Sequence, residues 1–309
     1  MPKKQTKAKT EKEKKIVVFY HKNCLDGFTA AWTAKKYFGS RADYIPLVHQ
    51  TPPPNNLAGK EVYMVDFCYN EDVMRQIKKR AARLVVIDHH ISQKEAVKIS
   101  DEHLYDLKHS GATLAWKYFF PGKTVPKISL FVEDRDIWKN KLKDAVPILA
   151  VLSTIDFDFR TWDTFAKKLE SAKSRAEIIK EGRAIVKSDR STIESVIAAA
   201  EPVKLAGRSA LAVNCPVLVS DIGHELAKAA GGLGIVWYVK SGRVKISLRT
   251  TLKVDAQKIA KKFGGGGHVG AASFSVPYDG KTIKLPFSPS SSRFFSQNTV
   301  SKRGRKKAK

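Results

Sequence analysis

Three short apolar runs near the start of the chain are each followed by histidine or aspartate. The runs 16–20, 62–65 and 84–87 are followed, in that order, by His21 and Asp26, by Asp66, and by Asp88-His89-His90. Helix-like spacing of apolar residues separates the runs, and this alternation favours an α/β fold with a doubly wound parallel sheet. Open sheets of this kind bind ligands at the carboxyl ends of their strands. Because buried carboxylates and imidazoles need a partner or a metal, we expect a metal site at one edge of the sheet.

Length and composition narrow the class of protein. With 309 residues, 43% of them hydrophobic, the chain can form one large or two medium domains with real cores. The three cysteines, Cys24, Cys68 and Cys215, form no CxxC pair. We therefore expect neither a disulfide framework nor a structural zinc finger, but a reducing, cytoplasmic compartment. No apolar run approaches ~18 residues and none precedes Ile16, so we expect neither a membrane span nor a signal peptide.

The net charge of +26 is extreme and partly local. Residues 1–15 carry seven lysines and two glutamates, and residues 289–309 carry seven basic residues and no acidic one. Two basic arms on a basic body predict contact with a polyanion, most simply nucleic acid. A generally basic, solvated surface is the alternative. Residues 302–307 could also act as a nuclear address, although any basic tail contains such a stretch.

Changes in pattern divide the chain into five parts. We expect a disordered basic tail, a catalytic domain built on the parallel sheet, a helical connector, a smaller mixed α/β substrate-binding domain and a second disordered basic tail. Their bounds are 1–15, 16–150, 151–204, 205–285 and 286–309.

The polar residues that follow the apolar segments suit metal-dependent hydrolysis of a phosphoester. Two-metal hydrolysis needs divalent ions roughly 3.5–4 Å apart, and oxygen and imidazole ligands suit Mn²⁺ or Mg²⁺. A single residue of this kind is more often an ordinary cap or ion-pair partner, but five after successive apolar segments favour a metal. The candidates are His21, Asp26, Asp66, His89 and either Asp134 or Asp136.

The order of these residues resembles the DHH phosphoesterases. That family includes RecJ-type exonucleases, nano-RNA nucleases, cyclic-dinucleotide phosphodiesterases and inorganic pyrophosphatases. Further along, Ser247-Leu248-Arg249-Thr250 and Gly264-Gly265-Gly266-Gly267-His268 resemble the DHH-associated substrate-binding domain. Asp-His-His alone is a weak signal, but together with the GGGGH run it is specific. The resemblance covers roughly residues 16–280.

The resemblance implies a role for each matching residue of the first domain. The metal ligands it implies are His21 and Asp26 in the first motif, Asp66 as the bridging residue, His89 at the second metal, and Asp136 or Asp134 as the fourth-motif aspartate, with Asp136 slightly favoured. Asp88 and His90 would orient these ligands or contact the transition state. The implied cofactor is one or two divalent ions, Mn²⁺ first and Mg²⁺ as the alternative.

In the second domain the resemblance implies a phosphate-binding site. Arg249, the four glycines 264–267 and His268 would hold a phosphate or a terminal nucleotide. Glycine lets the backbone approach a ligand closely, so that its N–H groups can surround phosphate oxygens, and arginine suits bidentate hydrogen bonding. A flexible hinge after a helix is the alternative interpretation of the glycine run.

One position departs from the family pattern. Cys24 stands where the first motif usually carries an aspartate. A thiolate prefers zinc or copper(I) to Mn²⁺. Cys24 is therefore either a ligand of a softer metal or a small buried filler, and in the second case the first metal has fewer ligands.

The sequence thus predicts a metal-dependent phosphoesterase with its active site between the two domains. Its substrates would be phosphodiester or phosphomonoester bonds of short oligonucleotides or nucleotide-derived compounds. The alternative, which Cys24 motivates, is a non-catalytic nucleotide or nucleic-acid binding protein on a degenerate DHH scaffold. The retained acidic and imidazole residues argue against this alternative. The sequence does not distinguish RNA from DNA as the substrate, and it predicts no particular oligomeric state.

Overall fold

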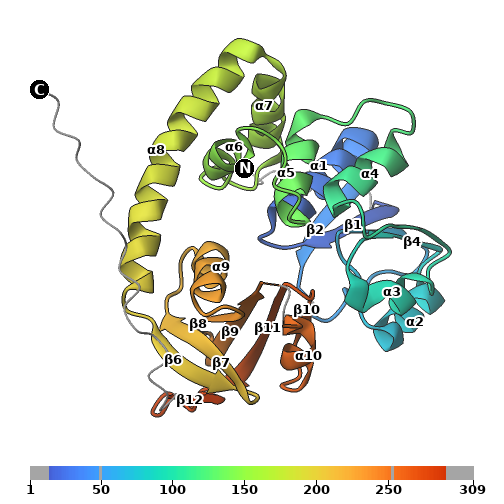
Figure 1. Ribbon diagram of the computed structural model, residues 1–309. Coiled ribbons are helices and arrows are strands. Elements are labelled where there is room, and N and C mark those ends of the chain that lie inside the picture. The colour runs from blue at the N-terminus through green and yellow to red at the C-terminus, as the bar shows by residue number, and fades with distance from the viewer. Residues whose placement is uncertain (1–13, 49–50, 252–253, 290–309) are drawn as a thin grey trace, which may run out of the picture. The chain divides into compact units, whose positions relative to one another are not determined.

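The computed structural model of this protein describes residues 14–48, 51–251 and 254–289. It divides into two compact units, residues 1–191 and 192–309, and the boundary falls near the end of the long helix α8 (Ala172–Ile197). Each unit has its own sheet (Figure 1). Each unit also has its own apolar cores. The two predicted basic tails lie almost entirely outside the described residues.

The first unit contains a parallel sheet of five strands in the order β2-β1-β3-β4-β5, which confirms the predicted doubly wound sheet. Strand order reverses at β1, since β2 pairs on one side of it and β3 on the other. The strands are β1 (Ile16–His21), β2 (Ala42–Leu47), β3 (Glu61–Val65), β4 (Arg83–Asp88) and β5 (Glu102–Tyr105).

Helices cover both faces of this sheet, because the side chains of each strand alternate between two cores. Val18 and Tyr20 enter a core shared with α1, α4, α5, α6 and α7, whereas Val17 and Phe19 enter a core shared with α2 and α3. Strands buried on both faces are continuous apolar runs, which explains their signal in the sequence. The helices are α1 (Leu25–Phe38), η1 (Gly39–Arg41), α2 (Glu71–Arg80), η2 (Ile91–Gln93), α3 (Lys94–Val97), α4 (Gly111–Phe119), α5 (Lys127–Asp136), α6 (Ala145–Leu152) and α7 (Phe159–Glu170).

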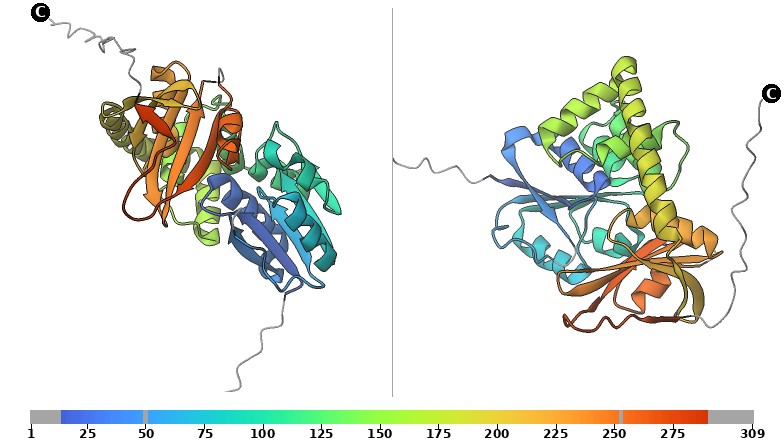
Figure 2. Two further views of the ribbon diagram at one scale, coloured as in Figure 1. Left: turned by 90° about the horizontal axis from the view of Figure 1, so that it is seen from below. Right: turned by 90° about the vertical axis from the view of Figure 1, so that its left-hand side faces the viewer.

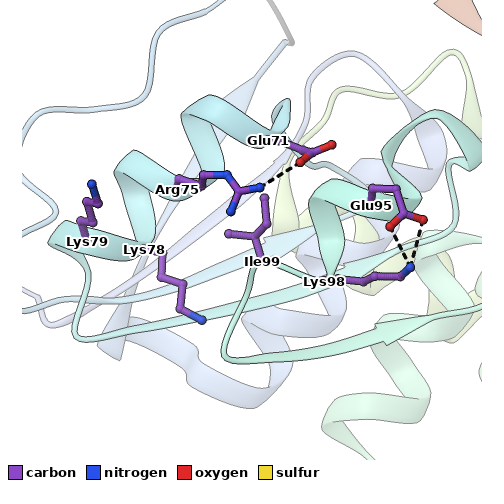
Figure 3. Close-up of a pocket in the computed structure, with 7 residues that line it drawn as sticks. All are labelled: Glu71, Arg75, Lys78, Lys79, Glu95, Lys98 and Ile99. Atoms are coloured by element: carbon purple, nitrogen blue, oxygen red, sulfur yellow. Dashed lines mark hydrogen bonds and ion pairs between the residues drawn. The ribbon is translucent and has the colours of Figure 1, made fainter.

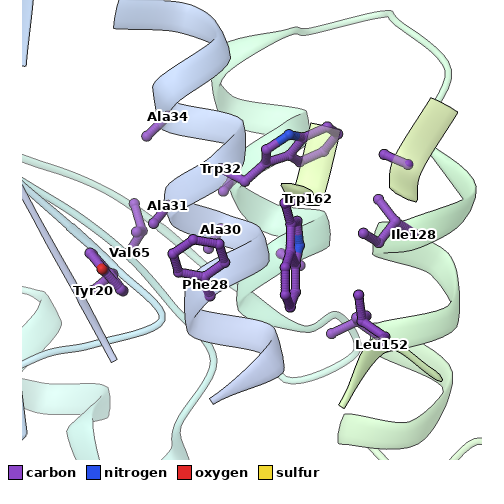
Figure 4. Packing of buried hydrophobic residues seen from close by; sticks show 14 of the residues in the cluster. Tyr20, Phe28, Ala30, Ala31, Trp32, Ala34, Val65, Ile128, Leu152 and Trp162 are labelled. Atoms are coloured by element: carbon purple, nitrogen blue, oxygen red, sulfur yellow. The ribbon is translucent and has the colours of Figure 1, made fainter. Parts of the chain in front are cut away.

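Trp162 of α7 joins the helical layer to α1 (Figure 4). It is fully buried, its ring meets Phe28 edge-on at a centroid distance of 4.9 Å, and its indole N–H donates to Thr29 Oγ1 at 3.3 Å. Burying an aromatic side chain of this size stabilises a fold by about 3 kcal/mol or more. The contact fixes α1, and α1 begins at the candidate metal site.

The second unit contains a mixed sheet of seven strands in the order β10-β11-β9-β8-β7-β6-β12 (Figure 2). Helix α9 (Val219–Ala229) packs on one face with Leu211 and Val213, and α10 (Ala256–Lys261) packs on the other with Ala210 and Ala212. This confirms the predicted smaller mixed α/β domain. The strands are β6 (Glu201–Leu205), β7 (Arg208–Asn214), β8 (Leu233–Lys240), β9 (Arg243–Thr250), β10 (Gly266–Gly267), β11 (Ala271–Pro277) and β12 (Phe287–Pro289).

Two strands differ from the sequence expectations. Residues 201–205, expected at the end of the helical connector, form β6, since Val203 and Leu205 are buried and Pro202 and Lys204 are exposed. Strand β12 falls within residues 286–309, which were expected to be disordered, and pairs antiparallel with β6. Among the described residues, no helix is both long enough and apolar enough to cross a bilayer.

Candidate metal centre

Eight of the predicted residues meet at the carboxyl ends of β1, β3 and β4. His21 ends β1, Asp66 follows β3 directly, and Asp88 ends β4. The first turn of α1 and the last residue of α5 add two further carboxylates. The residues brought together are His21, Cys24, Asp26, Asp66, Asp88, His89, His90 and Asp136.

His89 lies among three carboxylates. Its Nε2 is 3.3 Å from Asp66 Oδ1, 3.4 Å from Asp136 Oδ2 and 3.6 Å from Asp26 Oδ2. Burial alone would lower the pKa of His89, but its close contact with Asp66 and the charges of Asp66, Asp26 and Asp136 raise it to about 9. Burial and the neighbouring acids also raise the pKa of Asp26, and burial raises that of Asp136. The cluster therefore holds an excess of buried negative charge that a cation would neutralise.

Asp66 stands at the middle of the cluster. It is 1% exposed, and its φ of 51° is in the left-handed region, which costs a non-glycine residue conformational energy. Its Oδ1 faces His89, whereas its Oδ2 is 3.7 Å from His21 Nδ1. Among the described residues, neither oxygen accepts a hydrogen bond of normal geometry. Burial would raise the pKa of Asp66, but contacts with His21, His89 and His90 outweigh it and lower the pKa, so the carboxylate is charged. A charged, buried carboxylate whose oxygens accept no hydrogen bond of normal geometry is suited to binding cations.

Asp26 is held by the start of α4. Gly111 N–H donates to Asp26 Oδ2 at 2.6 Å and Ala112 N–H donates to Asp26 Oδ1 at 2.9 Å. The first N–H groups of a helix have no partner within the helix and favour a negative charge. A Cβ on Gly111 would lie 2.4 Å from Asp66 Cβ, so only glycine lets α4 approach this closely.

Asp88 lies behind the histidines rather than among the groups that surround His89. It is fully buried, and its Oδ1 accepts hydrogen bonds from His89 N, His90 N and His90 Nδ1 at 2.7, 3.2 and 2.7 Å. Burial would lower the pKa of His90, but the charge and bond of Asp88 outweigh it and raise the pKa to about 10. Asp88 thus fixes the orientation of the ring that it touches and keeps it protonated.

Asp134 and Asp136 have different places. Both belong to α5, and two residues along a helix correspond to a turn of about 200°, so they point in opposite directions. Asp136 faces His89, whereas the carboxylate of Asp134 accepts hydrogen bonds from Lys141 N at 2.9 Å and Leu142 N at 3.2 Å. The structure therefore brings Asp136 to the cluster, while Asp134 fixes the loop that follows α5.

The second unit carries the predicted phosphate-binding residues. Arg249 Nη2 donates to Ser220 Oγ at 2.6 Å, beside the start of α9. A Cβ on Gly265 would lie 2.2 Å from Ser273 O, and Gly267 has a φ of 137°, so close packing and backbone conformation account for these two glycines. A Cβ on Gly266 would meet nothing within 4 Å. Gly264 and His268, both described, flank β10.

The sequence profile of the DHHA1 domain matches residues 214–285. The uncharacterized protein R106 of Acanthamoeba polyphaga mimivirus is 31% identical over 312 residues, which cover 89% of this chain and 70% of the relative. This chain belongs to the DHH family of phosphoesterases.

Solved structures of the DHH family share the fold. The DHH domain of a member of the s1p family of ribosomal proteins matches with a TM-score of 0.60 at 15% identity, over 87% of this chain and 84% of that one. RecJ of Thermus thermophilus, solved in complex with Mn²⁺, matches with a TM-score of 0.50 at 16% identity. That match covers 84% of this chain but only 49% of the RecJ chain.

The residues of this DHH chain fit two divalent ions. We call His21, Cys24 and Asp66 the sulfur set, and Asp26, His89 and Asp136 the oxygen set. Within each set, one ligand atom per residue lies within 4.8 Å of the others. Asp66 also forms a close group with Asp88, His89 and His90, so it touches both sides of the cluster. Asp66 has ion-pair contacts with histidines but accepts no hydrogen bond of normal geometry among the described residues, which favours cations as the complement of these residues.

Glu133, which the sequence did not single out, holds the start of α4 in place. Glu133 of α5 is 5% exposed, and its Oε2 accepts a hydrogen bond from Ser110 N at 3.1 Å and lies 3.0 Å from His109 Nδ1. Ser110 caps α4, so Glu133 fixes the helix start that holds Asp26. The acidic run 133–136 is visible in the sequence, but the sequence does not show which acidic residues of that run face inward.

A groove elsewhere on the first unit does not belong to the centre. It lies between α2 and α3, and four of its charged residues pair with one another, Arg75 with Glu71 and Lys98 with Glu95 (Figure 3). None of the residues that line it belongs to the metal-binding cluster. It therefore adds nothing to the chemistry described above.

Proposed function

We propose that this protein is a metal-dependent phosphoesterase that acts on short oligonucleotides or nucleotide-derived phosphoesters. The observation that carries the proposal is Asp66, a buried carboxylate whose two oxygens face two different groups of ligands. A bridged pair of divalent ions is the arrangement that two-metal phosphoester hydrolases use. Membership of the DHH family and the basic composition of the chain support the same class of substrate.

The residues of the first unit would have the following roles. The sulfur set and the oxygen set would each hold an ion, and Asp66, a member of the sulfur set, also lies next to His89 of the oxygen set. When bound, such ions activate a water molecule and neutralise charge that develops on the phosphoryl oxygens. In the metal-free protein His90 holds a proton at neutral pH, because Asp88 raises its pKa to about 10. Since Nδ1 is bonded to Asp88, the Nε2 proton of His90 is the one it can donate to a phosphoryl oxygen or to the leaving group.

The second unit would bind the rest of the substrate. Arg249 is held by Ser220 and Leu248 O, which leaves a guanidinium of fixed orientation for a phosphate. The backbone at Gly266 is open to close approach, since a side chain there would meet nothing. We propose that Arg249, His268 and the glycine run 264–267 bind a phosphate of the substrate.

The test is hydrolysis of a 5′-labelled RNA dinucleotide and of a longer oligonucleotide in the presence of Mn²⁺. The full chain is compared with His89→Ala, which loses the imidazole between three carboxylates, and with Glu95→Gln, an exposed acidic residue outside the site. We expect Mn²⁺-dependent release of mononucleotides from the full chain and from Glu95→Gln, and a loss of about 100-fold or more in His89→Ala. Binding without turnover in Mn²⁺, Mg²⁺, Co²⁺ or Zn²⁺ would instead support the non-catalytic binding protein.

A further inference from the structure

The backbone on both sides of Cys24 fixes its position. It follows the left-handed residue Asn23, whose φ is 57°, and directly precedes α1. Its backbone carbonyl accepts the first hydrogen bond of the helix, from Phe28 N at 3.0 Å. The sulfur therefore sits between the end of β1 and the start of α1, and its ligand-atom distances to His21 and Asp66 fall within 4.8 Å.

The other two cysteines have ordinary packing roles. Cys68 and Cys215 are 0% and 5% exposed, and each thiol contacts a backbone carbonyl oxygen at 3.3 Å, that of Tyr69 and that of Val217. Cys24 is partly exposed and faces acidic and imidazole groups instead of a carbonyl or an apolar core. A buried filler would be surrounded by apolar side chains, so the surroundings of Cys24 are those of a ligand.

Asp66 gives an independent indication of a cation on this side of the cluster. Its Oδ2 points toward His21 and, among the described residues, accepts no hydrogen bond of normal geometry, although the residue is only 1% exposed. The oxygen set cannot satisfy this oxygen, because His89 faces Oδ1. His21 Nδ1 lies 3.7 Å from Oδ2, beyond normal hydrogen-bond distance, so a cation among Oδ2, the sulfur and the His21 imidazole would complete the surroundings of this oxygen.

We propose that Cys24 is a metal ligand and that the sulfur set selects a borderline-soft divalent ion of the Zn²⁺ type, while the oxygen set takes Mn²⁺. This inference rests on the proposed function only in assuming that the cluster binds two ions. Thiolate, imidazole and carboxylate together are typical zinc ligands. The oxygen set offers one imidazole and two carboxylates, a combination that suits Mn²⁺. The centre is therefore built for two different metals.

The test uses the metal-free full chain loaded with Co²⁺, whose bond to sulfur gives a charge-transfer absorption band in the near ultraviolet. We expect this band in the full chain and in Cys215→Ala, which removes a cysteine of the second unit. We expect Cys24→Asp to lose the band while still binding two Co²⁺ ions. When Zn²⁺ and Mn²⁺ are offered together, elemental analysis should find one of each in the full chain, and Cys24→Asp should shift the ratio toward Mn²⁺ by about tenfold or more.

The outcomes separate this inference from the proposed function. A band without phosphoesterase activity supports the sulfur ligand and overturns the enzyme. Activity with two bound Co²⁺ ions and no band overturns the sulfur ligand and leaves the enzyme standing. If Cys24→Asp does not fold, X-ray absorption at the zinc edge of the full chain decides, because one sulfur scatterer supports the proposal and none overturns it.

Discussion

At the scale of single residues, the charge of Asp136 favours metal binding but destabilises the metal-free protein. Burial raises the pKa of this carboxyl, which means that its charged form is unfavourable in the metal-free protein. We expect Asp136→Asn to lose metal affinity and hydrolysis by about 10-fold or more, because a ligand of the oxygen set is gone. We also expect the melting temperature of the metal-free protein to stay equal or rise. Metal titration tests the loss of affinity, and thermal unfolding tests the stability of the metal-free protein. A destabilised variant would contradict this account.

Asp134 provides the matched comparison two residues away. Its carboxylate accepts two backbone N–H groups of the loop after α5, from Lys141 and Leu142. We expect Asp134→Asn to lower the free energy of unfolding by about 1–2 kcal/mol, because charge-assisted hydrogen bonds are weakened. Thermal unfolding measures this, and metal affinity should fall less than in Asp136→Asn. Equal losses of affinity would show that Asp134 also contributes a ligand.

The sequence left these two aspartates unresolved for a physical reason. Spacing along the chain showed that an acidic run follows the apolar residues 128–132, but not that 127–136 forms a helix. Once it is a helix, two neighbouring aspartates cannot both face the cluster. Asp66 and Asp88 lie at or directly after the ends of buried strands. Their place could be predicted because the carboxyl ends of parallel strands lie along the same edge of a sheet.

At the scale of elements, the distance of α4 from β3 decides whether the site forms. The first helical residue of α4, Gly111, leaves no room for a side chain against Asp66. We expect Gly111→Ala to lower the melting temperature and to abolish stoichiometric metal binding, because α4 must move and its N–H groups then lose Asp26. Gly232→Ala is the control, since its Cβ would make only an ordinary 3.5 Å contact. Normal metal binding in Gly111→Ala would show that α4 can shift without disturbing the ligands.

Prediction of elements from the sequence succeeded for strands buried on both faces and was incomplete elsewhere. The strands β1, β3 and β4 are central in their sheet and were predicted; of the two edge strands, β2 was predicted in part, as residues 45–48, and β5 was missed. Strand β6 was hidden because its alternation of two buried and two exposed residues follows a charged helix directly. Edge strands bury less apolar surface, and so their periodicity is weaker.

At the scale of the whole molecule, the charge of the metal centre makes stability depend on pH. In the metal-free protein, the pKa of His89 is about 9 and that of His90 about 10, both above the ordinary value near 6.5. Raised values in the folded state mean that the stabilisation is present below about pH 6.5 and is lost as the pH rises toward 9–10. We expect the melting temperature of the metal-free protein to fall by roughly 5 °C or more between pH 6.5 and pH 9. Loading with metal should remove most of this dependence, and a metal-free protein with no such fall would contradict the charge balance described for the cluster.

The basic ends of the chain give the last prediction. Residues 1–13 carry five lysines and two glutamates, and residues 290–309 carry seven basic residues and no acid, so removing both takes away ten of the 26 net charges. If these ends contact phosphates, the logarithm of the binding constant for a single-stranded oligonucleotide will depend less steeply on the logarithm of the salt concentration. The slope should decrease by about 0.7 for each phosphate that the shortened chain no longer neutralises. Hydrolysis of a dinucleotide should be unaffected, because it has no further phosphates for the ends of the chain to contact. An unchanged slope for long oligonucleotides would exclude the ends as phosphate contacts and assign the polyanion binding to the basic body of the protein.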